Sequence, residues 1–394
     1  IGEAAFLNSG IVAVTIPDTV TEIEEDAFSG CTGLTSIKLP KNLKTLGGDA
    51  FRDCTGLTSV LIPKTVESIH TYSNGFFCPF RGCDNLQEVK FEDGMTRIPN
   101  LILGFCGAKL NIVIPDSVTE IGEAAFLNSG IVAVTIPDAV TEIEEDAFRG
   151  CTGLTDIKLP DSVVNIGTKI FANCTSLTDV TLPNAWELIP ASTFEGCTAL
   201  EKLVLPESVQ YIRDGAFKNC TALKEIVWSK APELIDSNAF YNCDAITEMD
   251  IPATVTSVGY QAFYDCDGLT KITIPDGVTS LGDSVFYDCD ALTDVKLGAG
   301  ITTIPASAFR HCDALEQLTV PRRVTAIKDN AFKDSVKFSS ITIPRSVTSV
   351  SANAFSYLDK LTIYGVAGTY AETFANTNSI KFVDRQVSAT SASL

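Results

Sequence analysis

The sequence predicts an α/β repeat solenoid in which each unit of about 23 residues carries one short parallel strand. A phenylalanine stands at the same point of each unit, and from Phe148 to Phe355 the spacing is an unbroken 23 residues. Small, aliphatic and proline residues recur around it in a fixed order. A period of this length is typical of solenoids, propellers and arrays. The recurring phenylalanines are Phe6, Phe28, Phe51, Phe80, Phe105, Phe126, Phe148, Phe171, Phe194, Phe217, Phe240, Phe263, Phe286, Phe309, Phe332 and Phe355.

Each unit reads A-F-x-x-C-x-x-L-x-x-I-x-L-P-x-x-V-x-x-I. In one copy Ile157 and Leu159 alternate with polar residues, which predicts a strand that buries one face. Pro160 ends this strand, because proline has no N–H to donate. Upstream, Ala147 and Cys151 are four residues apart, which predicts a short helical turn with its apolar side inward. The remaining V-x-x-I segment is expected to return to the next strand through a tight bend.

Repeat stacking sets the expected domain organisation. One unit cannot bury its apolar face alone, whereas three or more stacked units can. We expect about sixteen units to form one elongated domain over residues 1–363. The period breaks after that point, so residues 364–383 are predicted to form a cap that covers the last core layer and sheet edge. Residues 384–394 end in a Ser/Ala/Thr-rich stretch and are predicted to be a linker.

Two distant stretches of the chain are nearly identical. Residues 1–40 and 121–160 differ only at Thr19/Ala139, Ser29/Arg149 and Ser36/Asp156. The offset of 120 residues equals five units, which indicates a duplicated cassette and an adjustable array length. The chain also starts inside a unit, so its N-terminus is expected to be cut from a longer array. Adjustable length favours a spacer or a multivalent binder over an enzyme.

The combined pattern of Phe, Cys, Pro and spaced aliphatics resembles the BspA-type leucine-rich repeats, and this likeness covers residues 1 to about 383. The resemblance implies a right-handed leucine-rich-repeat superhelix on bacterial or protist surfaces. It also implies an extracellular or cell-surface location and adhesion to host matrix proteins or to other cells. The segment after residue 363 resembles the closing segment that is common in this family.

Composition narrows the class of partner. The formal net charge is −20, whereas nucleic acids and anionic membranes are recognised by basic surfaces. No apolar run reaches the 18 residues that suggest a membrane span. We therefore expect no nucleic-acid partner and no membrane insertion of this segment. Mutual repulsion between such acidic chains is expected to keep the protein monomeric.

Eleven of the thirteen cysteines stand three residues after the repeat phenylalanine. Stacked copies would place their Cβ atoms about 4.8 Å apart with parallel vectors, whereas a disulfide needs about 3.5 to 4.5 Å and converging ones. We therefore predict a column of buried free thiols. These cysteines are Cys31, Cys54, Cys83, Cys151, Cys174, Cys197, Cys220, Cys243, Cys266, Cys289 and Cys312.

One unit carries an insertion, because Phe51 and Phe80 are 29 residues apart. One interpretation is a zinc site with the ligands His70, Cys78, Cys83 and the off-register Cys106. The interpretation we favour is a loop packed by its own aromatic residues and without metal. Because recognition tends to sit on loops held by rigid scaffolds, the loop is a candidate contact site with the residues Tyr72, Phe76 and Phe77.

Three consecutive units carry a tyrosine directly after the repeat phenylalanine, at Tyr241, Tyr264 and Tyr287. Other units place mostly charged residues there, so we expect these rings to face solvent about 4.8 Å apart. Such a ladder suits a protein or sugar partner, and the alternative is self-stacking without a ligand. Carboxylates beside it leave calcium open as an alternative to a solvated acidic turn: Asp265, Asp267, Asp288, Asp290 and Asp313.

Catalytic signatures are lacking. The chain has two histidines, His70 and His311, and no G-x-S-x-G, H-E-x-x-H or phosphate-binding glycine loop. We predict that the protein is not an enzyme and uses no cofactor.

The predicted binding surface is the concave sheet, because solenoids use their curved faces to bind partners. Its outward residues change between units while the core residues do not, although a merely solvated sheet would look the same. The candidate residues are Lys38, Glu88, Lys90, Asp156, Lys158, Lys202, Glu225, Glu248, Asp250, Lys271 and Lys296. The leading hypothesis is an extracellular adhesion module for matrix or cell-surface proteins or glycans. The alternative is a structural spacer that displays another module.

Overall fold

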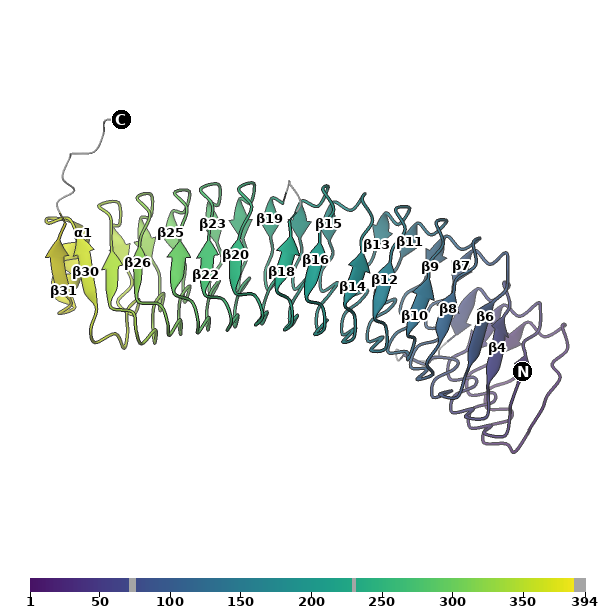
Figure 1. The fold of residues 1–394 in the computed structure, drawn as a ribbon. Helices are drawn as coiled ribbons and strands as arrows, with labels where there is room; N and C mark the ends of the chain where they lie inside the picture. Colours follow the sequence, from purple (N-terminus) through teal and green to yellow (C-terminus); the bar gives the residue numbers. More distant parts are fainter. Residues whose placement is uncertain (71–75, 229–231, 386–394) are drawn as a thin grey trace. The chain divides into compact units, whose positions relative to one another are not determined.

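The computed structural model describes residues 1–70, 76–228 and 232–385. It confirms the predicted repeat solenoid with parallel strands, and the coils consist of strands and turns with little helix. Strands of successive coils pair in parallel, with Met249 opposite Ile272 and Ile272 opposite Val295. Thr247 and Thr270, in adjacent coils, are 23 residues apart and share a hydrogen bond. Figure 1 shows the successive coils as repeated arrows along the ribbon.

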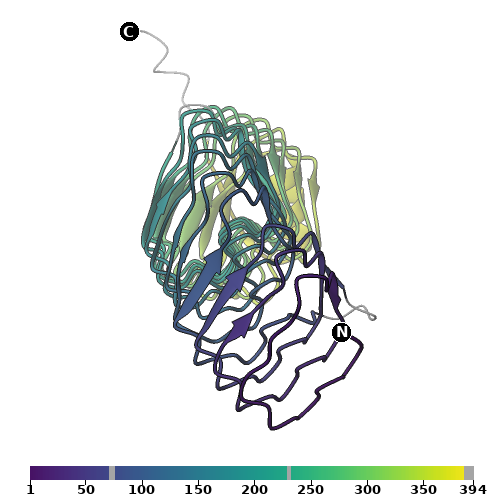
Figure 2. The same ribbon diagram turned by 90° about the vertical axis from the view of Figure 1, so that its right-hand side faces the viewer.

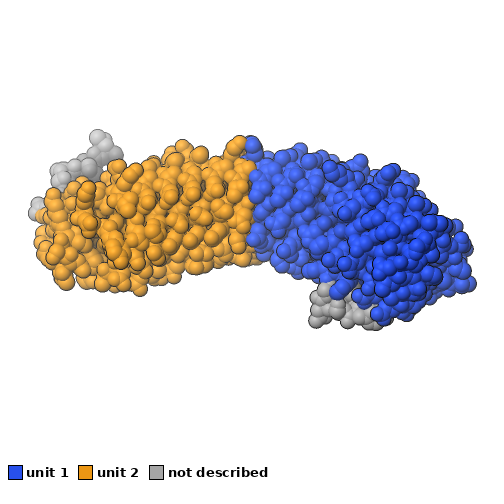
Figure 3. All heavy atoms as spheres, turned by 90° about the horizontal axis from the view of Figure 1, so that it is seen from below, with its two compact units in different colours: residues 1–186, 190–206 blue, residues 187–189, 207–394 orange. Residues whose placement is uncertain are grey.

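The chain divides into two compact units (Figure 3). Unit 1 comprises residues 1–186 and 190–206, and unit 2 comprises residues 187–189 and 207–394. The single continuous domain expected over residues 1–363 therefore stays a prediction. The expected linker, residues 384–394, lies outside the described residues from residue 386 onward.

The first ladder of strands forms where the I-x-L pattern predicts it. Its strands alternate between exposed outward residues and buried inward residues, as in Asp156, Ile157 and Lys158. In unit 1 these strands are β2 (Ile37–Lys38), β4 (Ser59–Ile62), β6 (Glu88–Phe91), β8 (Asn111–Val113), β10 (Ala133–Thr135), β12 (Asp156–Lys158), β14 (Asp179–Thr181) and β16 (Lys202–Val204). In unit 2 they are β18 (Glu225–Val227), β20 (Glu248–Asp250), β22 (Lys271–Thr273), β24 (Asp294–Lys296), β26 (Gln317–Thr319), β28 (Ser340–Thr342), β30 (Thr362–Gly365) and β31 (Lys381–Asp384).

A second ladder forms at the V-x-x-I segment, where the sequence predicted a returning bend. In Figure 2 the two ladders of unit 1 lie on different sides of the coil. The second-ladder strands of unit 1 are β1 (Glu22–Ile23), β3 (Thr45–Gly47), β5 (Ser68–His70), β7 (Arg97–Ile98), β9 (Glu120–Ile121), β11 (Glu142–Ile143) and β13 (Asn165–Ile166). Those of unit 2 are β15 (Leu188–Ile189), β17 (Tyr211–Ile212), β19 (Leu234–Ile235), β21 (Ser257–Val258), β23 (Ser280–Leu281), β25 (Thr303–Ile304), β27 (Ala326–Ile327) and β29 (Ser349–Val350). Strands this short show no alternation, so the pattern could not reveal them.

The repeat phenylalanines form the centre of the core. In both compact units the phenylalanine rings of neighbouring coils stack on one another. The ring centroids are 5.1 Å apart for Phe28–Phe51 in unit 1 and 5.7 Å apart for Phe263–Phe286 in unit 2. These four side chains have no exposed surface. Burial of a phenylalanine stabilises a fold by about 1.5–3 kcal/mol, so the column is a major source of stability.

One member of the phenylalanine series was assigned wrongly from the sequence. Leu103, not Phe105, takes the core position of its coil. The Leu103 N–H donates a hydrogen bond to the Ala125 carbonyl of the next coil, and the Phe126 N–H makes the equivalent bond to the Ala147 carbonyl. Leu103 is buried and Phe105 is only half-buried. The same shift places Cys106 three residues after the core residue, so this cysteine is in register with the others. The spacing from Phe80 through Leu103 to Phe126 is then 23 residues at each step.

Tight turns replace the predicted helical turn around each phenylalanine. In one coil Asp146 and Gly150, two residues before and after Phe148, have φ angles of 58° and 70°. A residue with positive φ interrupts a right-handed helix, and Gly, Asn and Asp tolerate this conformation best. These residue types accordingly fill the second of the two positions in most coils, as Asn173 and Asp265 do.

The thirteen cysteines are all free and buried, as predicted for the eleven that follow a repeat phenylalanine. In the repeated arrangement each thiol donates a hydrogen bond to the phenylalanine carbonyl of the preceding coil. The distance from Cys289 Sγ to Phe263 O is 3.0 Å, and that from Cys174 Sγ to Phe148 O is 3.1 Å. A small donor therefore satisfies one buried carbonyl in each such turn.

The end of unit 2 is closed by a short β–α–β segment. Helix α1 (Tyr370–Thr377) is the single α-helix of the described residues, and it connects β30 to β31, which pair in parallel. Phe374 of α1 lies edge-on against Phe355, with ring centroids 6.0 Å apart. The helix thus covers the last ring of the phenylalanine column. Among the described residues no helix has the length and hydropathy of a membrane span.

Candidate binding surfaces

The residues predicted for the binding sheet all occupy outward positions of first-ladder strands. All of them are exposed except Lys271, which is half-buried. They are Lys38 on β2, Glu88 and Lys90 on β6, Asp156 and Lys158 on β12, Lys202 on β16, Glu225 on β18, Glu248 and Asp250 on β20, Lys271 on β22 and Lys296 on β24.

The structure brings some of these charges together in unit 2. Lys271 lies opposite both Glu248 and Asp294 in the register of β20, β22 and β24. Its Nζ is 3.9 Å from Glu248 Oε2. An exposed ion pair of this kind contributes only about 0–1 kcal/mol. The row of Glu248, Lys271 and Asp294 is therefore a mixed-charge surface that adds little stability. Lys38 and Asp156 lie on other sheets of the chain, away from this row.

A groove in the first ladder of unit 1 combines charged and apolar side chains. It has a volume of about 500 Å³ and is lined by β4, β6, β8 and residues that follow β6 and β8. Leu61 and Val113, on either side of Lys90, are 50% and 67% exposed. Lys90 Nζ is 2.6 Å from Glu88 Oε1. Exposed apolar groups beside a charged pair are the chemistry of a protein contact.

The three tyrosines of unit 2 form the predicted stack on the surface. The rings of Tyr241 and Tyr264 are 4.7 Å apart and inclined by 3°, and those of Tyr264 and Tyr287 are 4.8 Å apart. At the two ends, Lys218 Nζ lies 5.5 Å from the Tyr241 ring and the guanidinium of Arg310 lies 5.2 Å from the Tyr287 ring.

This stacking limits what the tyrosine ladder can offer to a ligand. Each inner ring face is covered by another ring, and each outer face lies against a cation. A sugar that stacks on an aromatic face would have to displace Lys218 or Arg310. The ring edges and hydroxyl groups remain as contact groups, so a role of Tyr241, Tyr264 and Tyr287 in binding stays a prediction.

The acidic turns beside this ladder repel one another. Burial raises the pKa of Asp265, and the neighbouring Asp288 and Asp244 raise it further. Burial likewise raises the pKa of Asp290, with Asp313 as the next cause. Within the described ranges no three His, Cys, Asp or Glu side chains are arranged to hold a metal ion. The geometry of these turns therefore gives no support to the calcium alternative.

The zinc alternative finds no support either among the described residues. The proposed thiol ligands are engaged elsewhere: Cys83 Sγ lies 3.0 Å from Phe51 O, and Cys106 Sγ lies 3.7 Å from Cys83 O. Burial raises the pKa of Cys78 to about 12 and that of Cys106 to about 11. Zinc binds thiolates, and burial of this kind opposes their formation.

The aromatic loop of unit 1 is described only in part. Tyr72 lies outside the described residues. Phe76 is 47% exposed and packs at 6.4 Å against the ring of Phe105, while Phe77 is half-buried. The guanidinium carbon of Arg81 lies 5.6 Å from the centroid of the same Phe105 ring. Phe76 and Phe105 thus form a partly exposed aromatic pair, and their role in binding stays a prediction.

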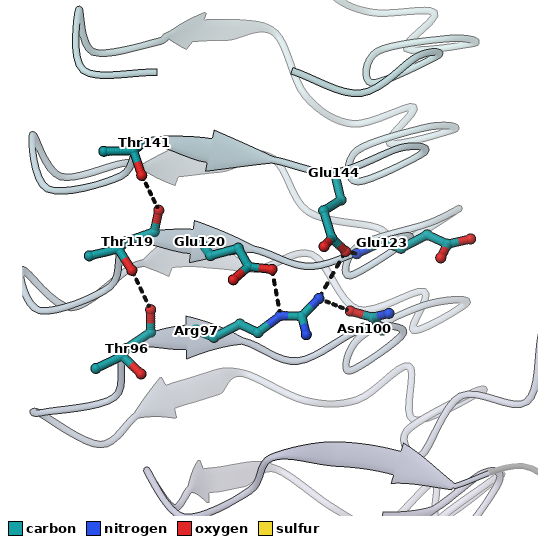
Figure 4. Close-up of polar contacts among 8 residues, drawn as sticks. All are labelled: Thr96, Arg97, Asn100, Thr119, Glu120, Glu123, Thr141 and Glu144. Carbon is teal, nitrogen blue, oxygen red and sulfur yellow. Dashed lines mark hydrogen bonds and ion pairs between the residues drawn. The ribbon is translucent and has the colours of Figure 1, made fainter. Parts of the chain in front are cut away.

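An arginine-centred network on the second ladder of unit 1 was not foreseen (Figure 4). Arg97 Nε is 3.0 Å from Glu120 Oε1, and Arg97 Nη2 is 2.9 Å from Glu144 Oε2. Arg97 Nη2 also donates to Asn100 Oδ1 at 2.7 Å. Burial raises the pKa of Glu120, and the nearby Glu144 carboxylate raises it further. The arginine therefore holds two carboxylates that would otherwise repel each other.

A second unforeseen feature is an apolar stripe on the second ladder of unit 2. Leu188 lies opposite Tyr211, and Tyr211 lies opposite Leu234. All three are half-buried. Aligning the residue before each V-x-x-I isoleucine would have revealed this stripe and the position of Arg97, because other repeats carry Ser, Thr, Glu, Asn or Ala there.

Comparison with known proteins agrees with this geometry. A family model described as BspA type leucine rich repeat region (6 copies) matches residues 1–132, 119–246 and 233–362. No curated protein matches the chain.

Solved structures share the fold. A leucine-rich repeat protein from Bacteroides ovatus is 24% identical over 89% of this chain and 92% of its own, with a TM-score of 0.67. A leucine rich cell surface protein from Faecalibacterium prausnitzii is 25% identical over the same shares, with a TM-score of 0.51. The pneumococcal vaccine antigen PcpA is 20% identical over 75% of this chain and 86% of its own, with a TM-score of 0.52.

The family model spans far more than half of the sequence, and the two pairing ladders supply the repeat geometry that it implies. Leucine-rich repeat proteins are generally protein-interaction modules built on a non-enzymatic scaffold. This chain belongs to the BspA-type leucine-rich repeat family.

Proposed function

We propose that this protein is a non-catalytic adhesion module that presents the outward face of its first ladder to protein partners of the extracellular matrix or of another cell. A glycan is the second ligand class. The observation that carries the proposal is the contrast between the two faces of the same strands. Inward residues are apolar and buried or half-buried in every strand, whereas outward residues change from lysine to aspartate, threonine or valine between coils.

The groove of unit 1 supports a protein contact most directly. Leu61 and Val113 expose apolar surface in this groove, and the charged groups of Glu88 and Lys90 line it too. Binding would remove this apolar surface from water, and a central apolar anchor with a polar rim is the usual arrangement of a protein interface.

A location at the cell surface is part of the same proposal. The Faecalibacterium prausnitzii relative is described as a cell surface protein, and the pneumococcal relative as a vaccine antigen. The net charge of −20 keeps such chains apart from one another in solution. Many weak contacts along repeated coils would add to a firm attachment.

Binding to immobilised matrix proteins, glycans and whole cells tests the proposal. A double variant, Leu61→Asp with Val113→Asp, places charge on the groove at exposed positions and should weaken binding about tenfold to a hundredfold. The matched control is Val164→Asp with Ser280→Asp, since both residues are exposed outside the first ladder. Equal loss in both variants would count against the first-ladder face.

A structural spacer is the second candidate function. It is favoured by the near-identity of residues 1–40 and 121–160, because a duplicated stretch lengthens the array. Absence of binding to every member of the panel, with function retained by a parent protein whose repeats are exchanged, would support the spacer and overturn the adhesion proposal.

A further inference from the structure

The sign of the charge reverses toward the last coils of unit 2. The whole chain carries −20, but residues 314–385 contain nine Lys and Arg against six Asp and Glu, a formal charge of +3. One repeated turn shows the change. Four successive coils fill it with aspartate followed by alanine or glycine, whereas the next two place lysine at the second position. The four turns are Asp244-Ala245, Asp267-Gly268, Asp290-Ala291 and Asp313-Ala314, and the two that follow are Val336-Lys337 and Asp359-Lys360.

The two lysine turns border a groove in unit 2. It has a volume of about 570 Å³ and is lined by residues that precede β26, β28 and β30, in the coils at the green-to-yellow end of Figure 1. Val336 and Tyr357 line it and are 70% and 73% exposed, and no other large apolar side chain of the described ranges is as exposed. The buried Phe338 also lines the groove, and its ring stacks on that of Phe332 at 4.5 Å. Exposed apolar groups thus lie on a packed base.

The lysines of this groove are not engaged by neighbouring carboxylates. Other cations of unit 2 are paired, since Arg310 Nη2 lies 3.3 Å from Asp334 Oδ2. Lys337 and Lys360 are both exposed, and neither forms an ion pair within the described part of the chain. Their ammonium groups are therefore available to an anion from outside.

The surroundings of the groove are basic on balance. Glu316 and Asp359 line it together with Lys337 and Lys360. Two more lysines lie at its margin. Lys333 Nζ is 5.4 Å from the Tyr357 ring, and Lys381 lines an adjoining groove that shares Lys360. Salt screens charges beyond about 8 Å, so these local lysines count for more than the net charge of the chain.

Tyr357 occupies a backbone position that does not suit a tyrosine. Its φ angle is 66°, and the equivalent residues of the three preceding coils, Asp288, His311 and Asp334, have φ angles of 62°, 58° and 65°. Asp, Asn and His tolerate this conformation better than a bulky aromatic residue does. Burial of the ring offers no compensation, because the side chain is largely in water. A residue that is unfavourable on both counts indicates a functional constraint.

We propose that this groove binds an acidic segment of a partner protein that carries a bulky apolar residue between its carboxylates. The apolar residue contacts Val336 and Tyr357, and the carboxylates pair with Lys337 and Lys360. Tyrosine is enriched among the residues that dominate binding energy, and complementary charge selects the partner. A glycan could stack on the ring but would leave Val336 without an apolar contact. The groove is formed by turns of unit 2, so it is separate from the first-ladder face proposed for adhesion.

Binding of an acidic peptide to the protein tests the proposal. The probe is a fluorescein-labelled peptide with one leucine and one tryptophan among glutamates, and fluorescence anisotropy measures its affinity. Lys337→Glu with Lys360→Glu should weaken binding at least about tenfold. The matched control is Arg322→Glu with Arg323→Glu, which makes the same change of charge at two exposed residues outside the groove. It should weaken binding less than about threefold.

Two altered peptides test the chemistry of the ligand. A peptide with serine in place of leucine and tryptophan should bind about tenfold more weakly, because it lacks the apolar contact. A peptide with lysine in place of glutamate should not bind. Undiminished binding of either peptide would overturn the proposal.

Tyr357→Asn separates a binding role from a structural one. Asparagine tolerates positive φ, so the variant should unfold at the same temperature as the native protein or at a higher one. The variant lacks the ring, so it should bind the peptide about tenfold more weakly. A lower unfolding temperature with unchanged peptide binding would show that the ring is structural and would overturn the proposal.

Other results would also overturn it. One is absence of peptide binding to the native protein, and another is equal loss of binding in the two double variants. Tighter binding of oligogalacturonate than of the peptide would make a glycan the occupant. Self-association of the protein that Lys337→Glu with Lys360→Glu abolishes would make the acidic surface of a second copy the occupant.

Discussion

Ser335 Oγ donates a hydrogen bond of 2.6 Å to the carbonyl oxygen of Phe309, in the place where cysteine stands in the preceding coils. Cys312 Sγ makes the equivalent bond of 3.0 Å to Phe286 O. The turn therefore needs a small side chain that can donate a proton to a buried carbonyl, and sulfur chemistry is not required. An unsatisfied buried carbonyl costs about 1–3 kcal/mol.

A change of Cys266 to Ser should therefore be tolerated better than a change to Ala. Cys266 Sγ lies 3.1 Å from Phe240 O. Cys266→Ser keeps a donor and should lower stability by less than about 1 kcal/mol, whereas Cys266→Ala removes it and leaves a small cavity, at a cost of about 1–3 kcal/mol. Urea unfolding midpoints of the two variants measure the difference. A serine variant less stable than the alanine variant would contradict the hydrogen-bond argument.

The buried thiols predict a loss of stability in alkali. Burial raises the pKa of Cys266 and of Cys197 from 9.0 to about 12. The folded state therefore holds these protons more tightly than the unfolded state does. The resulting stability is complete below pH 9 and is lost as the pH rises toward 12. Thermal unfolding between pH 8 and pH 11 should show a falling midpoint.

Thiol labelling provides an independent check of the same burial. At pH 8 a water-soluble thiol reagent should leave the folded protein almost unlabelled and should react with thirteen cysteines after unfolding. Rapid labelling of the folded chain would be incompatible with a buried thiol column.

The core was predictable from the sequence because stacking forces the same choice in every coil. Phe28 and Phe51 must match in size to stack, so the period alone located them. Positive-φ turns were less visible, since the conformation at Asp146 is compatible with several residue types. The assignment of Phe105 failed because residue type was given more weight than spacing, which favoured Leu103.

The candidate sites were less predictable, because they depend on contacts between coils. Arg97 and Glu144 are 47 residues apart, and no local pattern relates them. The first-ladder charges were located correctly as outward positions, since strand alternation fixes direction. Which of them meet, such as Lys271 and Glu248, follows only from the register of the coils.

The tyrosine stack predicts a stabilising role for its middle ring. The centroid of the Tyr264 ring lies 4.7 Å from that of Tyr241 and 4.8 Å from that of Tyr287. Tyr264→Ala removes both contacts and should cost about 1–3 kcal/mol, whereas Tyr264→Phe keeps them and should change stability by less than about 0.5 kcal/mol. Urea unfolding of both variants measures this. Burial is the main cause that raises the pKa of Tyr264 to about 12, and the negative charge of Asp288 is the next. In an ultraviolet titration Tyr264 should therefore ionise at a higher pH than an ordinary tyrosine. The Tyr264→Phe variant is the control that identifies its signal.

The Arg97 network predicts a larger effect than an ordinary surface ion pair. Arg97 is 37% exposed and holds Glu120 and Glu144, each 29% exposed. Arg97→Ala leaves the two carboxylates facing each other and should cost about 1–2 kcal/mol. Lys44→Ala is the matched control, because Lys44 is 61% exposed and its Nζ lies 3.2 Å from Oε1 of the exposed Glu67. Loss of this ordinary surface ion pair should cost less than about 0.5 kcal/mol.

A second substitution separates lost attraction from carboxylate repulsion. In the Arg97→Ala background, Glu120→Gln removes one of the two facing charges and should restore part of the lost stability. In the native background the same change removes the ion pair with Arg97, so it should destabilise the protein. This reversal of sign, measured by urea unfolding at low and at high salt, is expected only if Arg97 holds both glutamates. Destabilisation of equal size in the two backgrounds would show that the carboxylates act independently.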